Sequence, residues 1–353
     1  MKIGLLTFTD GTNIGQRLQN YALQTVLENE GHRVYTIKQG YPFNLTKKRV
    51  KEIINICLHF QHEYKIILRQ RKFTDFNSKY IKFYDKELSF WGSNSWISDQ
   101  FDSFIVGSDQ IWNPYSPFVG DNFFLTFTEP SKRMTYAPSF SVDSIPQEKR
   151  ERYVEYLNGF SNITIREDKG AEIVEMLTGK TAEVVLDPTF LLEKKDWDKI
   201  KKKYEKRPEN KYMLAMFLGD YPKEDIEKIE KNLDIPVLRV DSNAKISPDE
   251  FLDLAEHAEV VLTDSFHITV FSVLYHRPFV NFIRSGSGAS MNSRFATLYR
   301  LLGIENREWV YVEKHMQKIL EMQYEGIDRK IREERIRCLE ILRRELEKVS
   351  NSR

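Results

Sequence analysis

The feature that most constrains the fold is a strand–helix–strand alternation that repeats along nearly the whole chain. Apolar, β-prone residues at Lys2–Phe8 precede a helical pattern over Gln16–Glu30, and His32–Lys38 forms the next strand pattern. Gly31, between the last two, is typical of a helix C-cap. Two strands joined by one helix in so short a segment form a βαβ unit, which requires a parallel sheet. The sequence therefore predicts an α/β fold.

The alternation continues in two series of segments, separated by a charge-rich stretch at 193–211. In the first series, further strands are predicted at Phe104–Val106, Met134–Ala137, Asn162–Ile165 and Glu183–Leu186. In the second series, strands are predicted at Tyr212–Leu218, Val237–Val240, Glu259–Thr263 and Pro278–Ile283. We therefore predict two Rossmann-like, doubly wound domains that face a cleft, 1–192 and 193–314. A charged helical tail, 315–353, follows and could pack back on the first domain.

Composition excludes several classes of protein. The net charge is +1, from 53 basic and 52 acidic residues, so we expect no nucleic-acid partner. The two cysteines, Cys57 and Cys338, have no CxxC spacing, which favours the reducing cytoplasm. No apolar run approaches the roughly 18 residues of a membrane helix. HExxH, GxGxxG and P-loop motifs are all absent, so we expect no metal and no nicotinamide or ATP cofactor.

A basic segment near the N-terminus has two interpretations. Residues 46–72 hold eight lysines or arginines against Glu52 and Glu63, with apolar residues interleaved. Such a pattern is usually the solvated face of a helix. It also suits peripheral contact with an anionic membrane or a lipid diphosphate, which would place the protein at the inner face of the membrane.

The segment Val260–Leu274 carries the most specific signal. An apolar strand pattern leads through Asp264 and Ser265, good N-cap residues, into a helix that is apolar nearly all round and bears His267 in its first turn. Free N–H groups and the helix dipole favour an anion at such an end. A capped core helix with His267 bonded internally fits the local pattern equally well.

Two more strand ends carry charged residues. Arg166 can hold a carboxylate or phosphate through two N–H groups, although an exposed ion pair with Glu167 or Asp168 is the simpler interpretation of the local sequence. Asp187 precedes a proline, so it is interpreted as a turn residue. The small-residue loop 284–294, between two arginines, is either an anion-binding lid or a mobile surface connection.

Polar residues also follow two strands of the first series. The candidate ligand-binding residues in these loops are Asp10, Asn13, Gln16, Ser108, Asp109, Gln110 and Trp112. Asp109 could act as an acid or base or bind a sugar hydroxyl. Trp112 could stack on a sugar face, although a core tryptophan is more common.

Taken in order, the segments GSDQIWNP, TYAPSF, TIRED, VVLDPTFLL, TDSFHITVFS and NSR resemble the polysaccharide pyruvyl transferase family. The resemblance covers Met1 to Gly303. It implies two Rossmann-like domains of the glycosyltransferase-B kind, with the acceptor on the N-terminal domain and the donor on the C-terminal one. It also implies transfer of the pyruvyl group from phosphoenolpyruvate to a sugar, free or lipid-linked, giving a pyruvate ketal on a cell-surface glycan.

The resemblance also implies donor-binding residues. The arginine of the family's strand-end motif falls on Arg166, and its donor-binding segment falls on Ser265, Phe266 and His267. Many members have glycine where this chain has Ile268, and some have arginine where it has Ser265. We therefore expect Arg294 or Arg284 to supply the missing positive charge.

In this scheme His267 is the general acid or a phosphate ligand, and Asp109 activates the acceptor hydroxyl. Two alternatives remain open. A nucleotide-sugar glycosyltransferase of the same fold would use the same helix end for a diphosphate. A non-catalytic glycan-binding homologue would be consistent with Ile268 narrowing the pocket.

Overall fold

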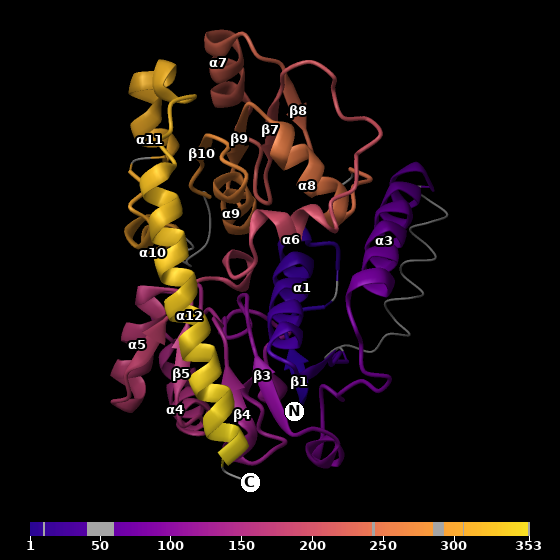
Figure 1. The fold of residues 1–353 in the computed structure, drawn as a ribbon, viewed down its shortest axis with the longest axis vertical. Helices are drawn as coiled ribbons and strands as arrows, with labels where there is room; N and C mark the ends of the chain where they lie inside the picture. The colour runs from indigo at the N-terminus through magenta and orange to yellow at the C-terminus, as the bar shows by residue number, and fades with distance from the viewer. Residues whose placement is uncertain (10, 41–59, 242–243, 285–292, 306, 352–353) are drawn as a thin grey trace.

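The computed structural model describes residues 1–9, 11–40, 60–241, 244–284, 293–305 and 307–351. Within these ranges the strands form two separate four-stranded sheets, with orders β2-β1-β3-β4 and β10-β9-β7-β8, and one two-stranded sheet, β5-β6 (Figure 1). Within the described ranges, the strands of all three sheets pair in parallel. We call the part that carries β1–β6 the N-terminal lobe and the part that carries β7–β10 the C-terminal lobe.

The strands of the N-terminal lobe are β1 (Lys2–Leu6), β2 (Arg33–Thr36), β3 (Ser103–Val106), β4 (Arg133–Thr135), β5 (Ile163–Ile165) and β6 (Ala182–Val184). Those of the C-terminal lobe are β7 (Met213–Met216), β8 (Val237–Arg239), β9 (Val260–Thr263) and β10 (Phe279–Asn281). The predicted α/β class is confirmed, and each strand named from the sequence is present. Several strands end earlier than predicted. In β6, Val185 and Leu186 were expected in the strand but lie beyond it, where they lead the chain to Asp187.

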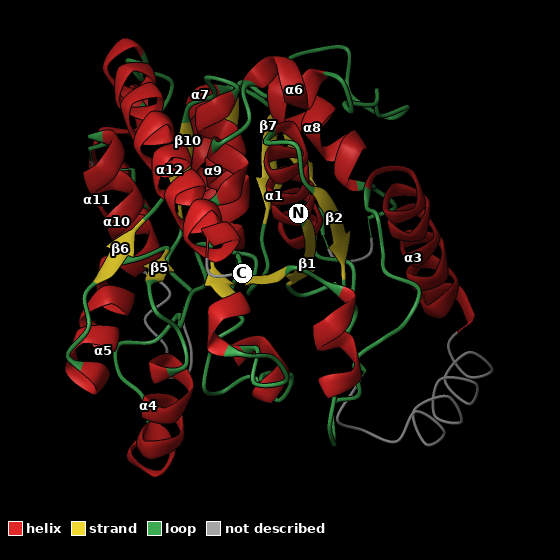
Figure 2. Cartoon of the chain, turned by 60° about the horizontal axis from the view of Figure 1, so that its bottom comes forward, coloured by secondary structure: helices red, strands yellow, loops and turns green. Residues whose placement is uncertain are grey.

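Helices cover both faces of the sheets, so that the strands lie between them (Figure 2). The helices of the N-terminal lobe are α1 (Ile14–Asn29), α3 (Phe60–Tyr80), α4 (Arg150–Asn158) and α5 (Asp168–Thr178). Those that follow are α6 (Lys194–Asp198), α7 (Lys223–Leu233), α8 (Pro248–His257), α9 (Phe266–Leu274), α10 (Ser293–Leu302), α11 (Trp309–Val312) and α12 (Glu325–Asn351). Asn13 caps α1 by accepting a hydrogen bond from the Gln16 amide at 3.2 Å, which fixes where the first loop becomes helix.

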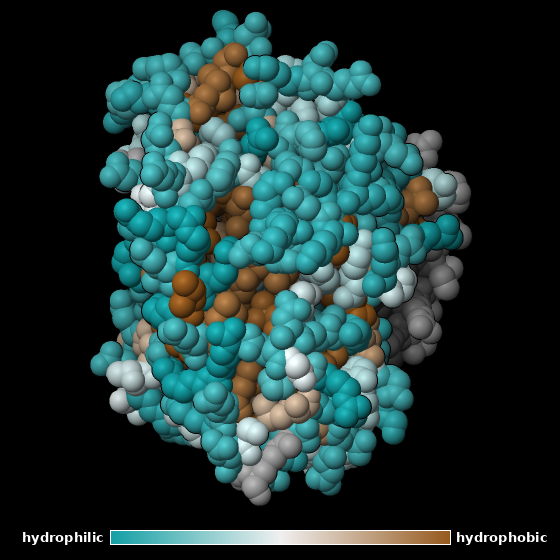
Figure 3. Space-filling view, in the orientation of Figure 1, coloured by the Kyte–Doolittle hydropathy of each residue, from teal (hydrophilic) through white to brown (hydrophobic). Residues whose placement is uncertain are grey.

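The two lobes share a continuous hydrophobic core. It runs from Leu5 in β1 and Leu18 in α1 to Leu254 in α8 and Phe271 in α9, all fully buried. Leu342, in α12, belongs to the same core. Apolar side chains also reach the surface in the middle of the face shown in Figure 3. The lobes are therefore packed together through α1, α8 and α9, which fixes the loops at their junction relative to one another.

The long C-terminal helix, α12, contacts both lobes (Figure 1). Near its start Asp328 pairs with His276 of the C-terminal lobe at 2.9 Å. Farther along, the Sγ atom of Cys338 accepts a hydrogen bond from the backbone N–H of Leu186, in the N-terminal lobe, at 3.3 Å. The tail predicted from the sequence is thus helical from Glu325 and bridges the lobes. Within the described ranges, no helix has both the length and the apolar character that a membrane span needs.

Candidate active site

A buried cluster of charged side chains lies where the lobes meet. Its members are Asp109, Arg166 and Asp187 of the N-terminal lobe and His267 and Arg294 of the C-terminal lobe; we call them the buried charge cluster. Each is less than a tenth exposed. Charged groups at this depth are costly unless they are paired or serve a ligand, so the cluster is the first candidate for the site.

Arg166 follows β5 directly, and its guanidinium is 2% exposed. Nη1 donates to Oδ2 of Asp187 at 2.8 Å, and Nη2 lies 3.6 Å from Oδ1 of Asp109. The exposed ion pair with a neighbouring acidic residue, considered from the sequence, does not form: Asp168 instead pairs with Arg300 at 2.6 Å. The Nε and Nη2 atoms of Arg166 have no hydrogen-bond partner among the described residues.

Asp187 is the residue that sequence reasoning missed. Its carboxylate is fully buried and accepts hydrogen bonds from Arg166, from Ser108 Oγ at 3.0 Å and from Thr189 Oγ1 at 2.7 Å. It also lies 3.4 Å from Nε2 of His267. The Asp-Pro turn predicted from the sequence is present, since the backbone N–H of Thr189 also donates a hydrogen bond to the Asp187 side chain. The same carboxylate nevertheless contacts residues of both lobes. The sequence signal that could have identified it is its position at a strand end, which it shares with Arg166.

His267 lies in the first turn of α9 and faces the N-terminal lobe. Its Nε2 atom is 3.4 Å from both Oδ2 of Asp187 and Nη1 of Arg166. On the other side its ring packs against Gly15 in α1, where an added Cβ would lie 2.3 Å from Nδ1. The imidazole is therefore held between an acidic group and the backbone of a helix from the opposite lobe.

Arg294 lies in the first turn of helix α10 and is 5% exposed. Its guanidinium lies over the ring of Phe266 at 5.7 Å, and that of Arg166 lies over the same ring at 4.8 Å. The side-chain oxygen of Gln110, when oriented toward Arg294, accepts from Nη2 at 2.9 Å and from Nη1 at 3.0 Å. The Nε atom has no partner within the described part of the chain. Phe266 thus presents two guanidinium groups side by side.

Burial and mutual charge set the protonation of this cluster. Burial alone would raise the pKa of Asp187, but His267 and Arg166 hold it well below its usual range. Burial, together with the nearby charge of Arg166, lowers the pKa of Arg294 to about 9, which leaves it charged at neutral pH. Burial would also lower the pKa of Arg166, but Asp187 and Asp109 raise it. At neutral pH the cluster therefore holds two cations and at least one anion.

The other donor candidates on the C-terminal lobe are differently placed. The Ser265 amide already donates to Thr263 Oγ1 at 3.0 Å, so it is not available at the start of α9. Arg284 donates from Nε to Oδ2 of Asp264 at 2.7 Å and lies in the rim of another cavity. Ile268, the departure from the family pattern, is a buried core residue. The structure thus gathers Arg166, Phe266, His267 and Arg294 but not Arg284.

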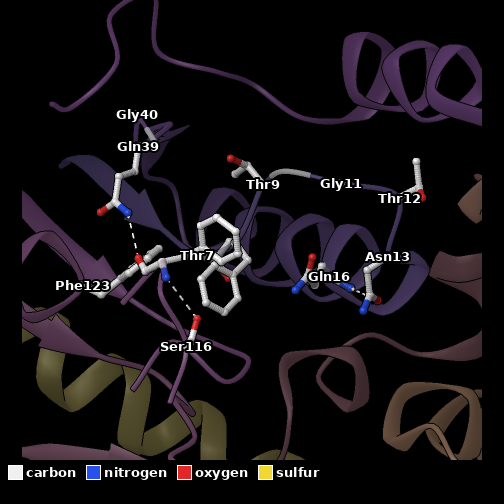
Figure 4. Close-up of a pocket in the computed structure, with 12 residues that line it drawn as sticks. Thr7, Thr9, Gly11, Thr12, Asn13, Gln16, Gln39, Gly40, Ser116 and Phe123 are labelled. Carbon is white, nitrogen blue, oxygen red and sulfur yellow. Dashed lines mark hydrogen bonds between the residues drawn. The ribbon is translucent and has the colours of Figure 1, made fainter. Parts of the chain in front are cut away.

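Beside the cluster, the loops after β1, β2 and β3 enclose a cavity of about 370 Å³, which we call the N-terminal cavity (Figure 4). Its lining residues are Thr7, Phe8, Thr9, Gly11, Thr12, Asn13, Gln16, Gln39, Gly40, Ser116, Phe118 and Phe123. Figure 4 shows Asn13 and Gln16 on the side opposite Gln39 and Ser116. Ligands of open α/β sheets bind at this carboxyl end of the strands.

Gln16 connects the cavity to the buried charge cluster. Its side chain lines the cavity, and its Nε2 atom donates to Oδ2 of Asp109 at 2.9 Å. Asp109 in turn faces Arg166. A ligand in the N-terminal cavity would thus be one side chain away from the carboxylate of the cluster.

The remaining candidates for acceptor binding are Trp112, Ser108 and Asp10. Trp112 corrects the expectation of sugar stacking: its ring is fully buried against Phe124, and its indole N–H donates to the Phe123 carbonyl at 2.9 Å. Ser108 is also fully buried and supports Asp187. Asp10 lies outside the described residues.

The basic segment 46–72 is only partly described, because residues 41–59 fall outside the described ranges. In α3, Arg69 is buried and donates to the backbone carbonyls of Thr12, Asp241 and Ala244 at 3.0 Å each. Lys72 pairs with Glu250 at 2.5 Å. Two of the cations considered for a membrane surface are therefore used to bind the C-terminal lobe. Arg69 also lines a cavity of about 510 Å³ between the lobes, together with Asn13 and Arg239.

Comparisons with known proteins agree with this architecture. UDP-N-acetylglucosamine 2-epimerase from Rickettsia bellii is similar over 99% of this chain and 97% of its own, with 10% identity and a TM-score of 0.56. The enzyme of the same name from Neisseria meningitidis, solved with UDP-GlcNAc, is 8% identical over 99% of this chain and 100% of its own, with a TM-score of 0.49. No curated protein matches the chain. At such low identity the likeness concerns the fold alone.

The two packed lobes, each with a parallel sheet, have the glycosyltransferase-B architecture, and the family match supports a transferase. A model of one family, described as polysaccharide pyruvyl transferase, matches residues 13–286. The chain belongs to the polysaccharide pyruvyl transferase family, as the ordered sequence motifs had indicated.

The contact between Gly15 and His267 makes a testable prediction. In Gly15→Ala the new methyl group would meet the imidazole at 2.3 to 2.6 Å, so α1 or α9 must shift. We expect a loss of about 1–3 kcal/mol in the free energy of unfolding, the usual cost of overpacking. Urea unfolding measures it. Gly326→Ala, with nothing within 4 Å of the added methyl group, is the control and should be neutral or slightly stabilising. Equal stability of Gly15→Ala and the parent would show that His267 does not pack on α1.

Proposed function

We propose that the protein transfers the pyruvyl group of phosphoenolpyruvate to a sugar of a cell-surface polysaccharide or its precursor, forming a pyruvate ketal and releasing phosphate. The observation that carries the proposal is a pair of buried guanidinium groups, Arg166 and Arg294, beside His267. Three of their N–H groups, Nε and Nη2 of Arg166 and Nε of Arg294, have no hydrogen-bond partner among the described residues. Buried donors without partners are costly, and a ligand with several anionic oxygens would satisfy them.

Phosphoenolpyruvate matches these groups because it carries two anions on one small molecule. The carboxylate and the phosphate can each accept charge-assisted hydrogen bonds from a guanidinium. Because the cluster is buried away from water, such bonds are stronger there than at the surface. The negative charge of the donor would also offset the repulsion between Arg166 and Arg294. Phe266, which lies against both guanidinium groups, fixes their orientation.

His267 is the proposed general acid. Oδ2 of Asp187 lies 3.4 Å from its Nε2 atom and orients the imidazole within the buried charge cluster. Transfer of a proton from His267 to the methylene carbon of phosphoenolpyruvate breaks the C=C π bond and leaves an oxocarbenium-like centre at C2. A sugar hydroxyl adds to C2, a second hydroxyl closes the ring, and the C2–O bond to phosphate breaks. Of the two hydroxyl protons, one restores His267 and the other leaves with phosphate, so atoms and charge balance.

The acceptor is proposed to occupy the N-terminal cavity, with Asn13 and Gln16 as hydrogen-bonding groups. Asp109, which Gln16 contacts, is the proposed base: it accepts the proton of the attacking hydroxyl and passes it to the leaving phosphate, while the proton of the second hydroxyl restores His267. Gln110 was expected to bind the acceptor, but its amide faces Arg294 of the buried charge cluster. The proposal includes no cofactor. It places the reaction in the cytoplasm, with a lipid-linked acceptor at the inner face of the membrane as one form of the substrate.

The test is incubation of the full-length protein with phosphoenolpyruvate and a panel of free, nucleotide-linked and lipid-linked sugars. We expect acceptor-dependent phosphate release and a product whose mass exceeds that of the sugar by one pyruvic acid less one water. Thermal unfolding should shift upward with phosphoenolpyruvate. Stabilisation by nucleoside diphosphates without any shift from phosphoenolpyruvate would instead identify a nucleotide-sugar glycosyltransferase. Saccharide binding without ketal product from any acceptor would identify a non-catalytic glycan-binding protein.

A further inference from the structure

A second cavity lies next to the N-terminal cavity and has an exposed tryptophan, Trp91, beside more deeply buried aromatic residues. It has a volume of about 460 Å³ and is formed by residues 90–92, residues 114–121 and helix α4; we call it the aromatic cavity. Its aromatic lining residues are Phe90, Trp91, Phe124, Tyr153 and Tyr156. Trp91 is 70% exposed, the most of any large hydrophobic side chain in the described ranges. An exposed tryptophan at the rim of a cavity is a common binding group for a partly apolar ligand.

The two cavities are contiguous. Ser116 lines both of them. Their walls are tied together, since Gln39 of the N-terminal cavity donates to the Phe118 carbonyl at 3.0 Å, and the Gly40 amide donates to the Leu88 carbonyl at 2.7 Å. The second contact holds in place the segment that leads from Leu88 to Trp91. A ligand longer than one sugar ring could therefore extend from the first cavity into the second.

Of the three charged residues that line the aromatic cavity, two form an ion pair and the third, Lys149, donates to a backbone carbonyl. Arg152 binds Asp121 at 2.5 Å, and the Lys149 ammonium donates to the Pro114 carbonyl. Among the described residues of the N-terminal cavity, none has a charged side chain; hydroxyl, amide and phenyl groups form its lining. A membrane surface or an acidic ligand would need a cluster of cations, whereas Lys149 is the one cation without a printed carboxylate partner among the described residues that line the two cavities. Aromatic rings beside hydroxyl and amide groups suit the apolar faces and hydroxyl edges of a neutral sugar.

We infer that the aromatic cavity is a second glycan subsite, which holds an uncharged sugar unit adjacent to the acceptor sugar of the N-terminal cavity. Trp91 stacks on that unit and serves as a specificity-determining residue for chain length. The inference rests on the proposed function, because it takes the N-terminal cavity to be the acceptor site. The substrate is then an oligosaccharide chain or polymer with neutral sugars beside the modified unit, and a single sugar is a poor acceptor.

Isothermal titration calorimetry of the full-length protein tests the subsite without requiring catalysis, and its signal does not depend on any tryptophan. The probes are glucose, mannose and N-acetylglucosamine and their linear hexasaccharides. We expect at least one hexasaccharide to bind about tenfold or more tightly than its monomer, since an aromatic side chain that a ligand covers on binding typically contributes a factor of this size. Trp91→Ala should remove that preference. Trp96→Ala is the matched control, because Trp96 is 40% exposed but lines neither cavity.

Three outcomes would overturn the inference: no hexasaccharide binds, hexasaccharide and monomer bind equally, or Trp91→Ala keeps the length preference. Binding of Trp91 to anionic phospholipid vesicles, with no saccharide effect, would assign the surface to a membrane instead. Thermal stabilisation by phosphoenolpyruvate, measured separately, reports on the proposed function. If it is absent while the Trp91-dependent length preference is present, the donor assignment fails and the glycan subsite stands.

Discussion

An Arg166→Lys variant is expected to lose about 10²–10³-fold in turnover while remaining folded. Lysine keeps a positive charge near Asp187, so the ion pair that now spans 2.8 Å can persist. It lacks the planar guanidinium whose Nε and Nη2 groups have no hydrogen-bond partner among the described residues and are proposed to hold the donor. The rate of phosphate release from phosphoenolpyruvate, with a saturating acceptor, measures the effect.

The control is Arg335→Lys in α12. Arg335 is also largely buried and donates to the carbonyls of Phe190 and Leu192, but it lies outside the buried charge cluster. Its turnover should stay within about twofold of the parent if only fold integrity is affected. Parental turnover in Arg166→Lys, with both variants equally stable, would remove Arg166 from the donor site.

Replacing Asp187 by asparagine is expected to destabilise the fold at neutral pH by about 3–5 kcal/mol, the usual effect of breaking a buried ion pair. Arg166 would lose its closest carboxylate and His267 its only carboxylate neighbour within 4 Å in the described ranges. Urea unfolding at pH 7 measures the loss. Asp168→Asn, which breaks the exposed pair with Arg300, is the control and should cost no more than about 1 kcal/mol.

The effect of Asp187→Asn should depend on pH. The pKa of Asp187 is lower in the folded protein than in the unfolded chain, where an aspartate titrates near about 4. Its stabilising contribution is therefore fully present above about pH 4 and is lost as the pH falls toward the folded-state pKa. The stability difference between parent and variant should shrink between about pH 4 and pH 2. A difference that stays constant over this range would show that the charge of Asp187 does not stabilise the fold.

The elements of this fold could be predicted from sequence because each depends on local pattern. The apolar run Val260–Leu262 and the cap residues before α9 specify a buried strand and helix wherever they occur. The order of motifs then placed Arg166 and His267 in one site, and the structure brings them to 3.4 Å. Their joint role in donor binding stays a prediction.

Partners across loops could not be predicted, because they depend on how distant segments pack. Asp187 is a turn residue by its own sequence, and only the approach of α9 from the other lobe makes it a neighbour of His267. Arg284 was an equal candidate with Arg294 for the donor charge, but Asp264 already binds it. Trp112 was a candidate binding residue because it follows a strand end. Its ring instead packs in the core against Phe124, Phe140 and Phe160.

The core that crosses from α1 to α8 and α9 has a consequence for how the molecule unfolds. Neither lobe can close its apolar surface alone, since Leu18, Leu254 and Phe271 belong to one continuous core and α12 is anchored on both sides of the junction. Loss of either lobe would expose the packing face of the other. The two Rossmann-like halves are therefore separate in topology, but we expect them to unfold as one cooperative unit.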